Sequence, residues 1–248
     1  MPTPAIEAAG LTKRYGDETA VDGLDLSIPQ GTVYGFLGPN GAGKTTTMRM
    51  LTTLTKPTHG TASVAGASIE DRDALVKRIG YLPEEPPLFD ELTGREQLEY
   101  IAGLRDLPPA DATERIDSLL ERFGLADDAD KRISAYSKGM KQKAGIVQAL
   151  LHDPEVVFLD EPTSGLDPRA ARTVRDTIAD LAEDETTVFL SSHILSVVDE
   201  LADTVGVLFK GDLVAEGGPE ALKKRAETGE QQSLEDVFLE VTTEVDGT

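Results

Sequence analysis

The sequence has no cysteine among its 248 residues, so it offers neither disulfides nor thiolate ligands for a metal, and the redox compartment stays open. No apolar run approaches the length of a membrane-spanning helix. The opening segment, Met1-Pro2-Thr3-Pro4, lacks the basic and apolar regions of a secretory signal. We therefore expect a soluble, cytoplasmic chain without direct membrane insertion, long enough for one large domain or two modest ones.

Positive charge is also scarce, because 24 lysine and arginine residues face 45 aspartate and glutamate residues, which gives a formal net charge of -21. This negative field repels phosphate backbones and anionic headgroups, so direct binding to nucleic acid or lipid is disfavoured. The sequence contains several clusters of acidic residues, which are interpreted as part of a solvated surface. We hypothesise a halophilic surface, since a high-salt cytoplasm would screen the repulsion between its charges.

One glycine-rich stretch matches a phosphate-binding pattern. The segment Gly38-Pro39-Asn40-Gly41-Ala42-Gly43-Lys44-Thr45-Thr46, the phosphate loop, fits G-x-x-x-x-G-K-[ST] between an apolar run and a helical one. Its glycines let backbone N–H groups turn toward a triphosphate, and the next helix N-terminus also favours anions. Lys44 adds a positive charge near the β- and γ-phosphates, and Thr45 adds a hydroxyl ligand for Mg²⁺. A chance glycine-rich turn is the alternative.

Acidic and histidine side chains follow two later apolar strands. Asp160, after 156–159, can hold Mg²⁺ directly or through water, and the adjacent Glu161 can polarise an attacking water. His193 follows the strand at 187–190 and can donate to a γ-phosphate oxygen or orient Glu161. Solvated strand ends and a structural histidine are the alternatives. His59 and His152, in proline-containing connections, are interpreted as structural.

Apolar strands alternate with helices, which indicates an α/β fold with a parallel sheet buried on both faces and its strand ends meeting at one edge. A helical face of Ile116, Leu119, Leu120 and Phe123 is predicted to lie in the core. Strands are expected at 5–11, 24–28, 33–37, 61–64, 79–82, 156–159, 187–190 and 205–209, and helices at 44–54, 73–77, 96–104, 111–123, 140–151, 169–182, 194–202, 220–227 and 234–241.

Turn chemistry predicts two hairpins. Pro29-Gln30-Gly31 is expected to join the strands at 24–28 and 33–37 as a hairpin, and Lys210-Gly211-Asp212 to form another. In the turn at 162–168, Asp167 is expected to cap the helix that the next proline opens.

These segments, together with Tyr136-Ser137-Lys138-Gly139-Met140, resemble the ATP-binding-cassette (ABC) ATPase domain, in order, over nearly the whole chain. Residues 136–140, the signature segment, separate this family from other phosphate-loop enzymes. Within the family the chain is most similar to ATPase subunits of ABC-2 type export systems, which include drug and antibiotic efflux, on residues 79–85, 136–143 and 234–239.

The resemblance implies a phosphate-loop NTPase (RecA-like) core with an N-terminal antiparallel β subdomain and an inserted α-helical subdomain. On it we expect the core at 1–83 and 152–215, the helical subdomain with the signature segment at 84–151, and a helical tail at 216–248. The resemblance also implies residue roles. In one copy, Tyr15 would stack on adenine, Lys44 and Glu161 would act in catalysis with Glu161 as general base, and His193 would be the γ-phosphate sensor. Between copies, Asp167 would be a dimer contact, and Ser137 and Gly139 would cap ATP bound to a second copy.

Three residues, in two segments, depart from the family pattern. Glu84 stands where the family usually has a glutamine that ligates Mg²⁺ and water. The expected metal ligands are therefore Thr45, Asp160 and, in place of the neutral amide, the carboxylate of Glu84. That carboxylate would repel the γ-phosphate if the metal left. In the signature segment, Lys138 and Met140 replace the usual glycine and glutamine, and no role is assigned to either.

The resemblance implies the nucleotide-binding subunit of an ABC transporter, in which ATP with Mg²⁺ closes a homodimer and hydrolysis drives a separate transmembrane subunit, in the export direction. Its place would be the inner face of the membrane, with the partner received near 86–92. A soluble ABC ATPase acting on DNA or ribosomes is the alternative, disfavoured by the net charge and the single cassette. A third is a nucleotide-regulated binding module with negligible turnover, encouraged only by Glu84.

The halophilic hypothesis predicts that molar KCl raises the free energy of unfolding, because salt screens repulsion among the acidic side chains. Urea unfolding followed at increasing KCl measures this directly. A midpoint that does not rise with KCl would rule out the hypothesis.

Overall fold

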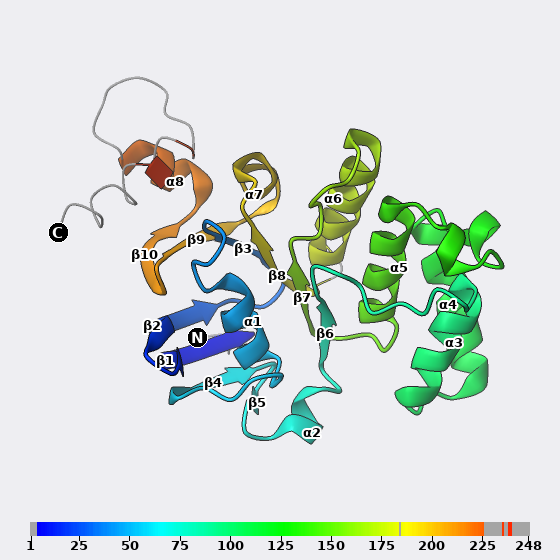
Figure 1. Ribbon diagram of the computed structural model, residues 1–248, viewed down its shortest axis with the longest axis horizontal. Coiled ribbons are helices and arrows are strands. Elements are labelled where there is room, and N and C mark those ends of the chain that lie inside the picture. Colours follow the sequence, from blue (N-terminus) through cyan, green and yellow to red (C-terminus); the bar gives the residue numbers. More distant parts are fainter. Residues whose placement is uncertain (1–3, 184, 226–234, 236–237, 240–248) are drawn as a thin grey trace.

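The computed structural model describes residues 4–183, 185–225, 235 and 238–239 of the chain. Two sheets lie side by side, and a block of helices lies beyond the second one (Figure 1). The first sheet has the antiparallel order β2-β1-β4-β5 and contains β1 (Ile6–Tyr15), β2 (Glu18–Ile28), β4 (His59–Val64) and β5 (Ala67–Ser68).

The second sheet has six strands in the order β10-β9-β3-β8-β7-β6. All neighbours are parallel except the β9–β10 hairpin, so the carboxyl ends of β3, β6, β7 and β8 meet at one edge, as the sequence predicts. Its strands are β3 (Val33–Leu37), β6 (Ile79–Leu82), β7 (Val156–Asp160), β8 (Thr187–Ser192), β9 (Thr204–Phe209) and β10 (Asp212–Gly217).

Helices occupy most of the predicted positions, with ends shifted by a few residues. They are α1 (Lys44–Leu51), α2 (Arg72–Leu75), α3 (Gly94–Leu104), α4 (Pro109–Arg122), α5 (Lys138–Leu150), α6 (Pro168–Glu183), α7 (Leu195–Leu201) and α8 (Pro219–Arg225), with short 3₁₀ turns at Ala126–Asp128 and Ile133–Ala135. Of the helix predicted at 234–241, the structure describes only residues 235, 238 and 239, which are helical; the rest lies outside the described residues. No helix of the described part is long and apolar enough to cross a membrane.

The hairpin predicted around residues 29–31 is wrong. β2 pairs antiparallel with β1, with Ile6 opposite Ile28, whereas β3 lies between β8 and β9 in the other sheet. Burial gives the reason: β3 is buried at all five positions, which suits a central parallel strand, while β2 has the alternating exposure of a strand with one solvated face. The turn at 29–31 therefore links two sheets. The hairpin at 210–212 is confirmed.

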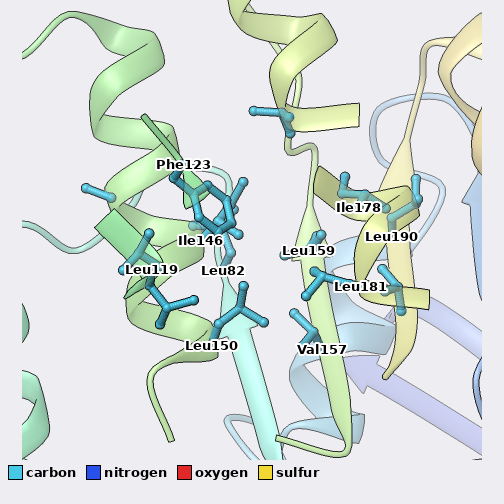
Figure 2. Packing of buried hydrophobic residues seen from close by; sticks show 14 of the residues in the cluster. Leu82, Leu119, Phe123, Ile146, Leu150, Val157, Leu159, Ile178, Leu181 and Leu190 are labelled. Atoms are coloured by element: carbon cyan, nitrogen blue, oxygen red, sulfur yellow. The ribbon is translucent and has the colours of Figure 1, made fainter. Parts of the chain in front are cut away.

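The six-stranded sheet separates two apolar cores. Alternate residues of β7 point to opposite sides, so that Val157 and Leu159 join one cluster and Val156 and Phe158 the other. Figure 2 shows the first cluster, where β7 and its neighbours meet α4, α5 and α6. The predicted core face of Ile116, Leu119, Leu120 and Phe123 is buried there, which confirms it.

His152 belongs to the structure rather than to a site, as expected. Its Nε2 lies 2.8 Å from the carbonyl oxygen of Ile79. Burial, assisted by Arg105, lowers the pKa of His152 to about 4, so the ring is neutral at pH 7 and donates to that carbonyl. His59 is exposed at the start of β4.

The contact between β6 and α5 predicts a position where even one methyl group destabilises the fold. A Cβ on Gly80 would come within 2.3 Å of the backbone oxygen of Ala149. Gly80→Ala should cost about 1–3 kcal/mol of unfolding free energy, measured by urea denaturation. Gly103→Ala is the control, because that glycine lies on the exposed side of α3 with nothing within 4 Å of the added carbon; it should be neutral or stabilising by about 0.5–1 kcal/mol. Equal effects of the two changes would contradict the prediction.

Candidate active site

The phosphate loop joins β3 to α1, and close backbone packing explains two of its glycines. A Cβ on Gly38 would lie 2.4 Å from the carbonyl oxygen of Leu208, and one on Gly43 would lie 2.4 Å from that of Ala20. Gly43 also has a φ of 110°, which side chains rarely allow. No side chain caps the N-terminus of α1. The loop thus presents a helix N-terminus suited to an anion.

A pocket of about 400 Å³ lies over this loop. Residues from β1, β2 and the ends of β6 and β7 complete it, so the two sheets both contribute. Its lining residues are Tyr15, Glu18, Ala20, Pro39, Asn40, Gly41, Gly43, Lys44, Thr45, Thr46, Glu84 and Glu161. Most of the predicted site residues are therefore brought together here. Ala42 of the loop is buried, and Gly38 and His193 line an adjoining cavity.

Tyr15 lies at the side of the pocket formed by β1, where it is 49% exposed. The ammonium of Lys13 lies 5.0 Å from the centre of its ring, within range of a cation–π interaction. An exposed ring supported by a neighbouring cation is available to a flat ligand. Its placement is compatible with the expected adenine contact, which stays a prediction.

Lys44 and Glu161 form a buried ionic contact in the pocket. The Lys44 Nζ lies 3.4 Å from Oε1 of Glu161, and each side chain is 7% exposed or less. Lys44 also donates to the carbonyl oxygens of Gly38, at 2.7 Å, and Pro39. Glu161 Oε1 has no hydrogen bond, and the residue has a φ of 49°, a conformation that costs energy for a side chain of this kind. A strained acid with one oxygen available is typical of a catalytic base.

His193 holds the other oxygen of Glu161. Its Nδ1 lies 2.9 Å from Oε2, and its backbone N–H donates to the same oxygen at 3.3 Å. Of the two roles expected for His193, the structure places it to orient Glu161. The contact with a γ-phosphate stays a prediction.

Asp160 is buried directly beside Glu161, with 1% of its surface exposed. Its Oδ1 accepts a hydrogen bond of 2.6 Å from the hydroxyl of Ser191, and that hydroxyl in turn accepts from the backbone N–H of Glu161 at 3.1 Å. Burial and the nearby Asp160 carboxylate raise the pKa of Tyr81 to about 12, so the phenol stays protonated.

Sequence reasoning missed Ser191 as part of the site. It faces Asp160 because the two residues are paired in the parallel register of β7 and β8. A serine at the end of the strand before His193 was visible in the sequence, but only the register shows that its hydroxyl joins the two acids.

The side chains predicted to hold Mg²⁺ fit that ion by their chemistry. Thr45, Glu84 and Asp160 offer hydroxyl and carboxylate oxygens, the donors that Mg²⁺ prefers. Thr45 and Glu84 line the pocket, and Asp160 lies just behind it. Among the described residues no group of three or more His, Asp or Glu side chains is arranged to hold a metal ion. Mg²⁺ at nucleotide sites usually takes phosphate oxygens and water as further ligands.

The signature segment lies outside this pocket. Ser137 caps α5 by accepting from the backbone N–H of Met140 at 3.2 Å, and Gly139 is packed against Ala170 of α6. Asp167 caps α6 as predicted, accepting two backbone hydrogen bonds of 3.0 Å. In Figure 1, α5 and α1 lie on opposite sides of β6 and β7. Within one chain, Ser137 and Gly139 are therefore not part of the phosphate pocket.

The sequence from β2 through Glu161 matches a family model described as ABC transporter, over residues 21–164. The chain belongs to the ABC transporter family. As a member, it is an ATP-binding subunit with ATP hydrolase activity and the phosphate-loop fold, as the sequence predicts.

Curated relatives include proteins of drug and antibiotic resistance. The daunorubicin resistance ATP-binding protein DrrA3 of Streptomyces coeruleorubidus is 46% identical over 92% of this chain and 72% of its own length. The bacitracin transport ATP-binding protein BcrA of Bacillus licheniformis is 44% identical over 89% of this chain and 72% of its own. These matches confirm the likeness to the export group.

Solved structures share the fold over nearly the whole chain. The ATP-binding subunit of an ABC transporter superposes with a TM-score of 0.86 at 29% identity, covering 96% of this chain and 99% of that one. The cbiO1 protein of Clostridium perfringens, part of the transporter complex cbiONQ, gives 0.82 at 26% identity, covering 91% and 92%.

The bridge made by Ser191 predicts a metal-linked defect on its removal. Ser191→Ala leaves the buried Asp160 oxygen without its hydroxyl partner, so the half-saturating Mg²⁺ concentration for ATP hydrolysis should rise about 10- to 100-fold. A Mg²⁺ titration of phosphate release measures it. Ser192→Ala is the control, since among the described residues that hydroxyl accepts only from the backbone N–H of Ile194. An unchanged Mg²⁺ requirement in the Ser191 variant would show that the bridge does not position Asp160.

Proposed function

We propose that the chain is the ATPase subunit of an exporter, in which two copies close head to tail around ATP and drive a separate membrane subunit. The observation that supports this most is the division of the site: the pocket has one set of phosphate contacts, and Ser137 and Gly139 lie elsewhere, at the N-terminus of α5. A second copy could bring that N-terminus to the pocket, where its amides would bind the γ-phosphate.

In the proposed reaction, Glu161 removes a proton from water as the water attacks the γ-phosphorus, and the bond to the β-phosphate oxygen breaks to release ADP and phosphate. Lys44 and the loop amides hold the phosphate charge, and His193 keeps Glu161 aimed. When bound through Thr45, Asp160 and Glu84, Mg²⁺ would supply further positive charge to the phosphate oxygens.

The contact between Lys44 and Glu161 links binding to activation. Phosphate oxygens would compete with Glu161 for the lysine, because both are anions and Lys44 is the only lysine among the described residues that line the pocket. Once Lys44 turns to the phosphates, Glu161 keeps its contact with His193, and its Oε1 is left available to a water. Substrate binding would thereby expose the base to the water it acts on.

An exposed aromatic pair supports a protein partner beside the pocket. Phe89 and Tyr100 are 49% and 47% exposed, and their rings meet edge to face at 5.6 Å. Phe89 lies in the segment 86–92, where a membrane subunit is expected, and Tyr100 of α3 is packed against it. Large exposed apolar side chains favour protein contact. Attachment there would place the chain on the inner face of the membrane. The names of the relatives favour export of a drug-like or antibiotic substrate, selected by the membrane subunit.

Glu161→Gln should separate ATP binding from hydrolysis. The amide keeps the shape of the side chain but cannot take the proton, so the hydrolysis rate should fall about 10²- to 10⁴-fold, and ATP should convert the variant to a stable dimer in size-exclusion chromatography. Adding Ser137→Ala to that variant should abolish the dimer while ATP binding to single chains persists. Normal turnover in Glu161→Gln would refute the base assignment.

The same ATP-locked variant identifies the partner class. Recovered from cells with its natural neighbours, it should bring down a protein with several membrane spans. Recovery of ribosomal RNA or DNA in its place would support the soluble alternative and contradict export.

A further inference from the structure

The pocket is acidic for a site that binds a triphosphate. Glu18, Glu84 and Glu161 line it together with a single lysine, Lys44. Glu161 is held by Lys44 and His193, but Glu84 is exposed and takes part in no hydrogen bond or ion pair with any other described residue. The Glu84 carboxylate therefore adds a negative charge beside the phosphates, and no cation in the described part of its own chain pairs with it.

Lys138, in the signature segment, is an exposed charge of the opposite sign. It is the first residue of α5, is exposed, and forms no ion pair within the described part of the chain. Its ammonium is directed over the loop that leads to Asp167: a Cβ on Gly165 would come within 2.2 Å of the Lys138 Nζ. Gly165 has a φ of +65° and no side chain, so the loop leaves room for this cation beside Ser137.

Lys138 has further cationic groups near it although the chain is strongly acidic. Burial, and to a lesser degree the charge of Arg169, lowers the pKa of Lys143 five residues along α5, so Arg169 lies near this helix, while Asp167 acts in the opposite direction. Two chains with a net charge of -21 repel each other. A basic signature end facing an acidic pocket would oppose that repulsion where the two copies meet.

We propose that Lys138 of one copy offsets Glu84 in the pocket of the other, so that the two charged departures from the family pattern form one charge pair across the dimer. The proposal rests on the head-to-tail dimer proposed above. A glutamine in the pocket opposite a glycine in the signature segment is neutral on both sides. A glutamate and a lysine in those places also sum to zero charge, but the two side chains meet only when a second copy binds. Lys138 would thus be a positioning residue that makes closure depend on both the γ-phosphate and the partner's charge.

Charge reversal tests the pair. In the Glu161→Gln background, Glu84→Lys places two cations opposite each other, and Lys138→Glu places two anions. Each should raise the ATP concentration for half-maximal dimerisation by about tenfold or more. Sedimentation in ATP with EDTA measures dimers without a metal, so a lost Mg²⁺ ligand does not contribute. Glu85→Lys, which changes the net charge equally at an exposed position outside the pocket, is the control and should leave the ATP concentration unchanged.

Mixing the two reversed chains decides whether the pair forms between copies. A mixed dimer has the two substituted positions together at one site and the natural pair at the other, so an equimolar mixture should dimerise near the parent ATP concentration. The chain with both reversals should do the same alone. If only the double-reversed chain recovers, the contact is within one chain, and if neither recovers there is no such pair; both results overturn the proposal.

Ser137→Ala in the same background keeps this test separate from the proposed function. If Ser137→Ala abolishes the dimer but the mixture of the two reversed chains does not recover, only the charge pair is refuted and the head-to-tail dimer stands. An ATP-dependent dimer that forms normally without the Ser137 hydroxyl would instead contradict the head-to-tail site itself.

Discussion

The site depends on keeping Lys44 and Glu161 charged in a buried place. Removing an ion from water costs several kcal/mol unless it is paired and hydrogen-bonded. Here the cost is offset from several elements: loop carbonyls accept from the lysine, and His193 contacts the acid. These groups come from the ends of β3, β7 and β8, which only a parallel register brings to one edge. The buried ion pair therefore requires the sheet order.

The cost of this arrangement appears in the backbone. Glu161 has a positive φ, and its backbone N–H is held by the hydroxyl of Ser191, which also binds Asp160. One hydroxyl thus holds the carboxylate of Asp160 and the backbone of the adjacent Glu161. Strain at Glu161 is maintained because β7 is buried on both faces and cannot relax.

Sequence reasoning found the parts of the site that are local in the chain. The phosphate loop, Asp160 and Glu161 each follow a recognisable apolar strand, so their chemistry can be predicted from the sequence alone. What it could not supply is pairing between distant segments. The turn at 29–31 looked like a hairpin because turn chemistry is local, whereas the choice between two sheets depends on how β3 is buried. Ser191 was missed for the same reason, since its role depends on the register with Asp160.

The packing of α5 links the pocket to the signature segment. A Cβ on Gly145 would come within 2.6 Å of Leu82 and 2.8 Å of Pro86, so α5 lies directly against the residues on either side of Glu84. With so little free space, a shift of the backbone at Glu84 has to move α5 as well. Ser137 and Lys138 are at the N-terminus of that helix. Nucleotide chemistry in one chain would therefore alter the position of the groups it offers to the second, and the segment at 86–92 would move with them. The same contact would give a membrane subunit docked near Phe89 a direct mechanical link to both halves of the nucleotide site.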